Sequence, residues 1–81
     1  MVRAMTYPPT HRDLVDKALT YLKENKRKEY RVMTIMQRTE YAESAAKRAE
    51  RYANTLQKMG MFESEAWNTA IRQEILENAG D

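Results

Sequence analysis

The scarcity of turn-forming residues is the feature that most constrains what this chain can fold into. Its 81 residues include only two glycines and two prolines, and there is no cysteine. The helix-favouring residues Ala, Leu, Met, Lys, Arg, Glu and Gln are frequent, whereas a strand-rich fold would need more turn-forming residues. The sequence therefore predicts an all-α fold, a small bundle of three to four helices.

The two prolines separate a short leader from the rest of the chain. Pro9 disfavours helical backbone at Pro8, so we expect residues 1–9 to form a loose N-terminal leader and residues 10–81 a single helical domain. Thr10 is a good N-cap, and Asp13 suits the first turn of a helix. A first helix is predicted over residues 10–26. The stretch Asn25–Lys28 favours a joint, although a helix that continues through it remains open.

Apolar spacing predicts three further helices, over residues 28–38, 40–59 and 65–78. Thr39 and Ser64 are the expected N-caps of the last two. Gly60 is expected to end the third helix at the left-handed C′ position, and Gly80 to end the fourth. Apolar residues are dense in the second helix, so we expect much of its circumference to be covered.

The third predicted helix carries a face of small residues that would let another helix approach closely. Two compatible interpretations remain open: packing within the core of one chain, or an interface between two copies in a homodimer. In both, the large side chains of Phe62 and Trp67 would pack from outside the contact between the helices. The residues of this candidate helix–helix interface are Ala42, Ala45, Ala46, Ala49, Ala53 and Leu56.

Charge is distributed unevenly along the chain, whose net charge is +2. Residues 1–38 carry nine Lys and Arg against four Asp and Glu, whereas residues 61–81 carry one against five. A basic cluster with two nearby tyrosines could neutralise several phosphates, or meet an acidic protein surface. The alternative is that its charges are solvated, some of them paired with the acidic last helix. The candidate binding residues are Lys23, Lys26, Arg27, Lys28, Arg31 and Arg38.

Residue types needed for covalent chemistry are few. The single histidine, His11, is expected to be a solvated polar residue at a helix start, since no partner lies at recognisable catalytic or metal-ligand spacing. No glycine-rich phosphate loop occurs. We therefore expect a non-enzymatic protein with no cofactor, no metal and no small-molecule substrate. Because no apolar stretch approaches the roughly 20 residues that span a bilayer, we also expect a soluble protein without a membrane partner. The absence of cysteine favours the reducing cytoplasm as its location.

Several short stretches resemble the TnpV-like proteins encoded by bacterial transposons and conjugative elements. They are Leu19–Glu24 with Arg27 and Tyr30, then Glu40–Ala42, then Trp67 followed by Ala70–Arg72 and Glu74–Ile75. The resemblance covers roughly two thirds of the chain, which is shorter than that family between its third and fourth helices. It implies a helical accessory protein of a mobile element, and it transfers no catalytic residue.

The leading functional interpretation is a binding protein that uses its basic surface to meet nucleic acid or a nucleoprotein. Two alternatives remain open. One is a homo- or hetero-oligomeric protein-interaction module, in which the basic residues only solvate the surface. The other is a small inhibitor of a host nucleic-acid enzyme, comparable to anti-defence or anti-CRISPR proteins.

Overall fold

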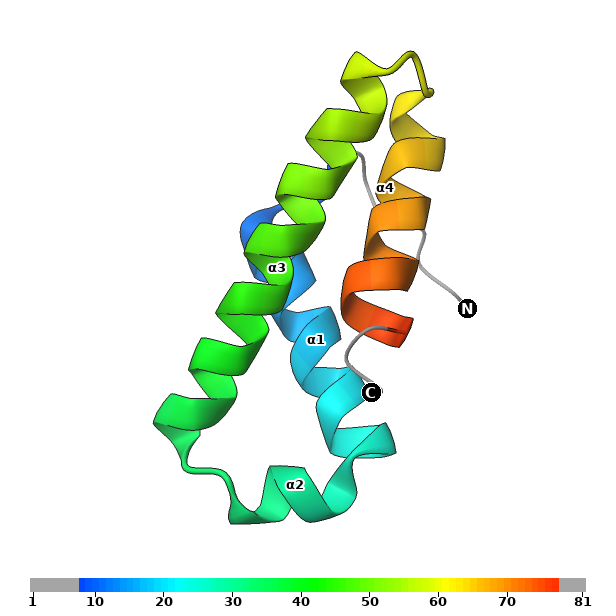
Figure 1. The fold of residues 1–81 in the computed structure, drawn as a ribbon. Coiled ribbons are helices and arrows are strands. Elements are labelled where there is room, and N and C mark those ends of the chain that lie inside the picture. The colour runs from blue at the N-terminus through cyan, green and yellow to red at the C-terminus, as the bar shows by residue number, and fades with distance from the viewer. Residues whose placement is uncertain (1–7, 78–81) are drawn as a thin grey trace, which may run out of the picture.

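A computed structural model describes residues 8–77 and shows an all-α bundle (Figure 1). Helix α1 (His11–Asn25) leads through a short α2 (Arg27–Val32) into the long α3 (Ile35–Lys58), and α4 (Glu63–Ile71) continues as a π-helical segment, η1 (Arg72–Glu77). Helix α3 packs against both α1 and α4, and α1 also contacts η1. The predicted fold class is therefore confirmed.

The first helix begins and ends within one residue of its predicted bounds. The Thr10 hydroxyl accepts a hydrogen bond from the Asp13 backbone N–H, and the Asp13 carboxylate accepts one from the Thr10 N–H, so the two form a reciprocal capping box. Pro9, at the end of the predicted leader, is buried, while residues 1–7 lie outside the described residues. Helices α1 and α2 are not continuous, because Lys26 leaves helical geometry at φ −128° and ψ 55°.

The boundary between the second and third helices differs from the prediction. Helix α2 ends at Val32 rather than at residue 38, and α3 begins at Ile35 rather than at residue 40. Thr34, not Thr39, is the N-cap of α3: its hydroxyl accepts from the Gln37 N–H at 3.1 Å, and the Gln37 side chain accepts from the Thr34 N–H at 2.9 Å. The extended residue Met33 precedes this cap and separates the two helices.

The turn after α3 forms as its glycine predicts. Gly60 has φ +101°, its N–H donates to the Gln57 carbonyl, and the next N–H, of Met61, donates to the Leu56 carbonyl. These two bonds make a Schellman motif. Helix α4 then starts at Glu63 after Phe62, which gives no side-chain cap, so the predicted cap at Ser64 is wrong. The predicted stop at Gly80 lies outside the described residues.

Small side chains dominate the core. Ala42, Ala45, Ala46, Ala49 and Ala53 of α3 have no exposed surface. They pack with two residues of α1 and with side chains of α4 and η1: Leu14, Ala18, Trp67, Ala70, Ile71 and Ile75. With so little side-chain bulk on α3, the two neighbouring helices approach its backbone closely, which explains how a chain this short encloses a core.

Candidate nucleic-acid interface

Helix α2 and the bend that joins it to α1 lie at one end of the molecule (Figure 1). Four of the six candidate basic residues belong to this bend and helix: Lys26, Arg27, Lys28 and Arg31. The Lys26 N–H donates to the Leu22 carbonyl at 2.9 Å, and the Lys26 carbonyl accepts from the Tyr30 N–H at 2.8 Å. Backbone hydrogen bonds therefore continue on both sides of a bend that is one residue long. Lys23 precedes the bend by about one helical turn, and Arg27 and Arg31 follow it.

Lys23, Arg27 and Arg31 line one surface hollow of about 480 Å³, together with Glu24 and Tyr30. All three cationic side chains are exposed. They share this hollow even though the helix is interrupted between them. We call this set of five residues the basic hollow; its three cations outnumber its single carboxylate.

The other three candidate residues have different positions. Lys28 is exposed on α2 and Lys26 is half-buried at the bend, and neither lines the basic hollow. The Arg38 guanidinium lies 3.8 Å from the centroid of the Tyr30 ring, and its Nε donates to the Tyr30 carbonyl at 2.9 Å. Arg38 therefore connects α3 to α2 and holds Tyr30 in place at the basic hollow.

The described acidic side chains of α4 and Glu74 of η1 form no salt bridge with these basic residues. Glu74 of η1 pairs with Arg48 of α3 at 3.2 Å, and no salt bridge within residues 8–77 involves Lys23, Lys26, Arg27, Lys28 or Arg31. Glu24 is the one carboxylate that lines the basic hollow, and within residues 8–77 it forms no salt bridge with the three cations, so their positive charge exceeds its negative charge and remains available to a ligand.

The alanine face of α3, by contrast, lies inside the bundle. Its five alanines are fully buried and Leu56 is 8% exposed. Helices α1 and α4 of the same chain already occupy this face. A second copy would have to displace one of them to use it, so the interpretation that fits the structure is packing within one chain.

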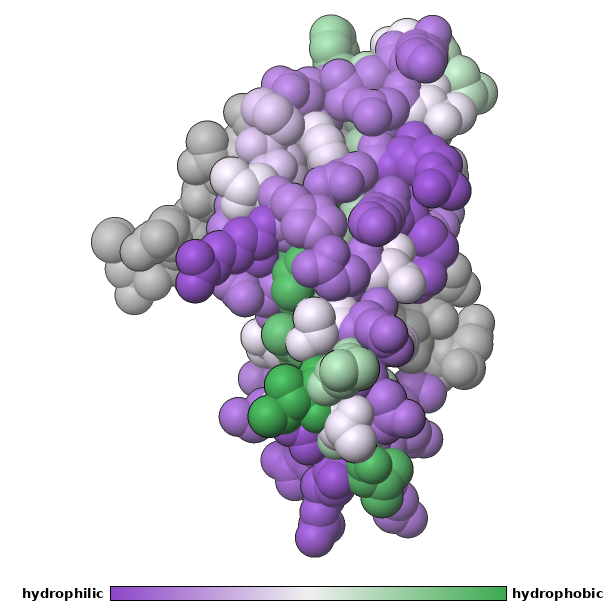
Figure 2. Space-filling model, turned by 90° about the vertical axis from the view of Figure 1, so that its left-hand side faces the viewer, coloured by the Kyte–Doolittle hydropathy of each residue, from purple (hydrophilic) through white to green (hydrophobic). Residues whose placement is uncertain are grey.

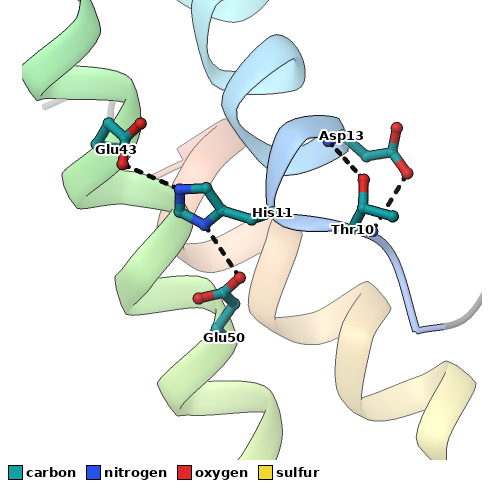
Figure 3. Close-up of polar contacts among 5 residues, drawn as sticks. All are labelled: Thr10, His11, Asp13, Glu43 and Glu50. Atoms are coloured by element: carbon teal, nitrogen blue, oxygen red, sulfur yellow. Dashed lines mark hydrogen bonds and ion pairs between the residues drawn. The ribbon is translucent and has the colours of Figure 1, made fainter.

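A contact that sequence reasoning missed links α1 to α3 through His11 (Figure 3). Its Nε2 lies 3.0 Å from a Glu43 oxygen and its Nδ1 lies 3.1 Å from a Glu50 oxygen. Hydrogen bonds to the two carboxylates raise the pKa of His11 above its ordinary value of 6.5. His11 is thus a half-exposed residue that connects α1 to α3 through two carboxylates, and its protonation strengthens that connection. Glu43 and Glu50 are two helical turns apart on one face of α3, and that spacing is the signal that could have indicated it.

Across the described part of the chain, no group of three or more His, Cys, Asp or Glu side chains is arranged to hold a metal ion. None of the helices in that part combines the length and the apolar character needed to cross a bilayer. Comparison of the chain with protein families, curated proteins and solved structures found no match.

Proposed function

We propose that this chain is a small, non-enzymatic binding protein of the cytoplasm that contacts nucleic acid, or the nucleic acid of a nucleoprotein, through its basic hollow and Lys28. The observation that carries the proposal is the convergence of Lys23, Arg27 and Arg31 on one hollow, where none of the three has a salt-bridge partner among residues 8–77. Phosphate groups suit such a site, since Lys and Arg side chains supply most backbone contacts to nucleic acids. The resemblance to TnpV-like proteins favours a role as an accessory protein of a mobile element.

Tyr30 adds a second kind of contact to the proposed site. It lines the basic hollow, and the Arg38 guanidinium covers its ring at 3.8 Å. An aromatic ring held beside three cations suits a single strand, whose unpaired bases stack on aromatic and guanidinium planes. We therefore expect single-stranded nucleic acid to bind more tightly than duplex of the same length.

The test is a pair of charge-reversal variants matched in net charge. Arg27→Glu with Arg31→Glu removes two cations from the basic hollow, whereas Lys47→Glu with Arg51→Glu makes the same change at exposed positions of α3. Fluorescence anisotropy with a labelled single-stranded oligonucleotide should show loss of binding in the first variant and a small decrease in the second. Equal decreases in both would mean that net charge alone attracts the oligonucleotide, and the proposal would fail.

A further inference from the structure

Helix α2 is largely exposed to solvent. None of its residues is buried, and Val32 at its end, with Ile35 and Met36 at the start of α3, are 81%, 78% and 72% exposed. The prediction that much of the second helix would be covered is therefore wrong. Figure 2 shows strong green at the surface low on the molecule, where Figure 1 places α2 and the start of α3, among largely purple side chains. The basic hollow, which α2 helps to form, is thus accessible to a ligand as large as a nucleic-acid strand.

The basic hollow has room for one nucleotide. Its volume of about 480 Å³ lies within the roughly 300–1,000 Å³ of sites that take a single small molecule. Tyr30 is the one aromatic side chain among its described lining residues, and Arg38, which lies over one face of that ring, does not line the hollow. At most one face of the ring is therefore open to a base. Sites that follow a strand stack successive bases on several aromatic side chains, over about 4–16 nucleotides, whereas this hollow suits one base.

The charge around the hollow matches a doubly charged anion. Its three cations, with Glu24 as the one carboxylate, leave an excess of two positive charges. A phosphodiester inside a strand carries one negative charge, whereas a phosphomonoester at a strand end carries about −1.5 to −2 at neutral pH and offers three strong acceptor oxygens. A guanidinium can bind two such oxygens at once. Three cations that converge on one hollow therefore favour one terminal phosphate over phosphodiesters, which are spread along the strand.

We propose that the basic hollow binds the phosphorylated end of a single strand, with the terminal base on Tyr30 and the terminal phosphate held by the three cations. This inference rests on the proposed nucleic-acid binding and names the part of the strand that the site takes. One nucleotide enters the hollow, and Lys28, which lies outside it, meets phosphates that follow in the strand. The protein thereby marks the place where a strand ends and does not coat the strand along its length.

Three short, internally labelled single-stranded oligonucleotides separate a strand end from added charge. The first ends in hydroxyl groups, and the second carries a terminal phosphate, placed at the 5′ end and at the 3′ end in separate samples. The third ends in hydroxyl groups but is two nucleotides longer, so it has about the same added charge as the second. Fluorescence anisotropy should show roughly tenfold tighter binding of the second than of the first, for at least one of its two ends, about the effect of one charge-assisted hydrogen bond. The third should bind only slightly more tightly than the first.

Two exposed positions of α2 give matched protein variants. Arg31 lines the basic hollow, and Lys28 does not. Arg31→Gln should remove most of the preference for the terminal phosphate. Lys28→Gln should weaken the binding of all three oligonucleotides to a similar extent and keep the preference. Circular dichroism should show native helix content in both variants, because Gln is as good a helix former as Lys and Arg.

Four results would overturn the proposal. If the longer oligonucleotide gains as much affinity as the phosphorylated one, or neither gains any, the strand end is not recognised, although the proposed function stands. If Arg31→Gln keeps the full preference, the terminal phosphate lies outside the basic hollow. If free adenosine 5′-monophosphate binds as tightly as the phosphorylated oligonucleotide, the ligand is a nucleotide and not a strand end. If none of the oligonucleotides binds, the proposed function and the recognition of a strand end fail together.

Discussion

Placing a larger side chain on the buried alanine face of α3 is the perturbation whose effect on stability follows most directly from the fold. Ala49 has no exposed surface, and its neighbours along this face, Ala46 and Ala53, have none either. A leucine at position 49 therefore has to fit into a core that is already filled by its other alanines and by larger side chains such as Leu14, Trp67 and Ile75. Relief requires a helix to move, which places the cost near the upper part of the roughly 1–3 kcal/mol typical of overpacking.

For a domain of this size, a loss of about 2–3 kcal/mol corresponds to a decrease in Tm of roughly 8–24 °C. Thermal and urea unfolding of Ala49→Leu, followed by far-UV circular dichroism, would measure this loss. Lys47→Leu is the matched control, since it adds the same side chain at an exposed position of the same helix and should change stability by no more than about 0.5 kcal/mol. If Ala49→Leu is as stable as the control, the alanine face of α3 is not buried within one chain. If Ala49→Leu instead forms a dimer more stable than the wild type, that face meets a second copy.

Three further predictions concern single contacts. Thr34→Ala should lower the free energy of unfolding by about 1 kcal/mol in urea titrations through loss of the α3 cap, while Thr39→Ala, inside the helix, should have no comparable effect. The pKa of His11 is raised in the folded state, so its contribution to stability is complete below the unfolded pKa and is lost as pH rises through the folded pKa. Because His11 is partly exposed, this loss of stability should stay below about 1 kcal/mol. The free energy of unfolding of His11→Gln, measured over the same pH range, should not show this loss. Trp67 is buried, and its Nε1 has no hydrogen-bond partner in the described part of the chain. Trp67→Phe should therefore lower the free energy of unfolding by under about 1.5 kcal/mol, whereas Trp67→Ala should lower it by about 3–5 kcal/mol. Equal losses in the two variants would contradict a packing role for the Trp67 ring.

Sequence patterns predicted the elements whose signals are local. Thr10 begins α1 and Gly60 ends α3, because an N-cap hydroxyl and a left-handed glycine act within a few residues of themselves. The start of α3 was misplaced by five residues because two threonines compete for it. Thr34 has Gln37 three residues later and so forms a reciprocal cap, whereas Thr39 has Ala42 at that spacing. The capping-box pattern was therefore present in the sequence and would have identified the correct start.

Features that depend on how the helices are arranged were less predictable. Nothing local shows that Ile35 and Met36 stay exposed, because their coverage depends on whether another helix crosses the start of α3. The contact of His11 with Glu43 and Glu50 joins residues more than 30 positions apart. The grouping of Lys23, Arg27 and Arg31 was suggested by their four-residue spacing, but their relation to Tyr30 and Arg38 depends on the bend at Lys26.

The salt dependence of oligonucleotide binding tests the central claim most directly. If the three cations of the basic hollow, with up to two neighbouring lysines, neutralise phosphates, the logarithm of the association constant should fall linearly with the logarithm of salt concentration, with a slope between about −2 and about −4.5. Replacing Arg27 by Ala should reduce the steepness by about one phosphate contact. A slope near zero, or the same slope after that replacement, would contradict a phosphate-binding role for this surface.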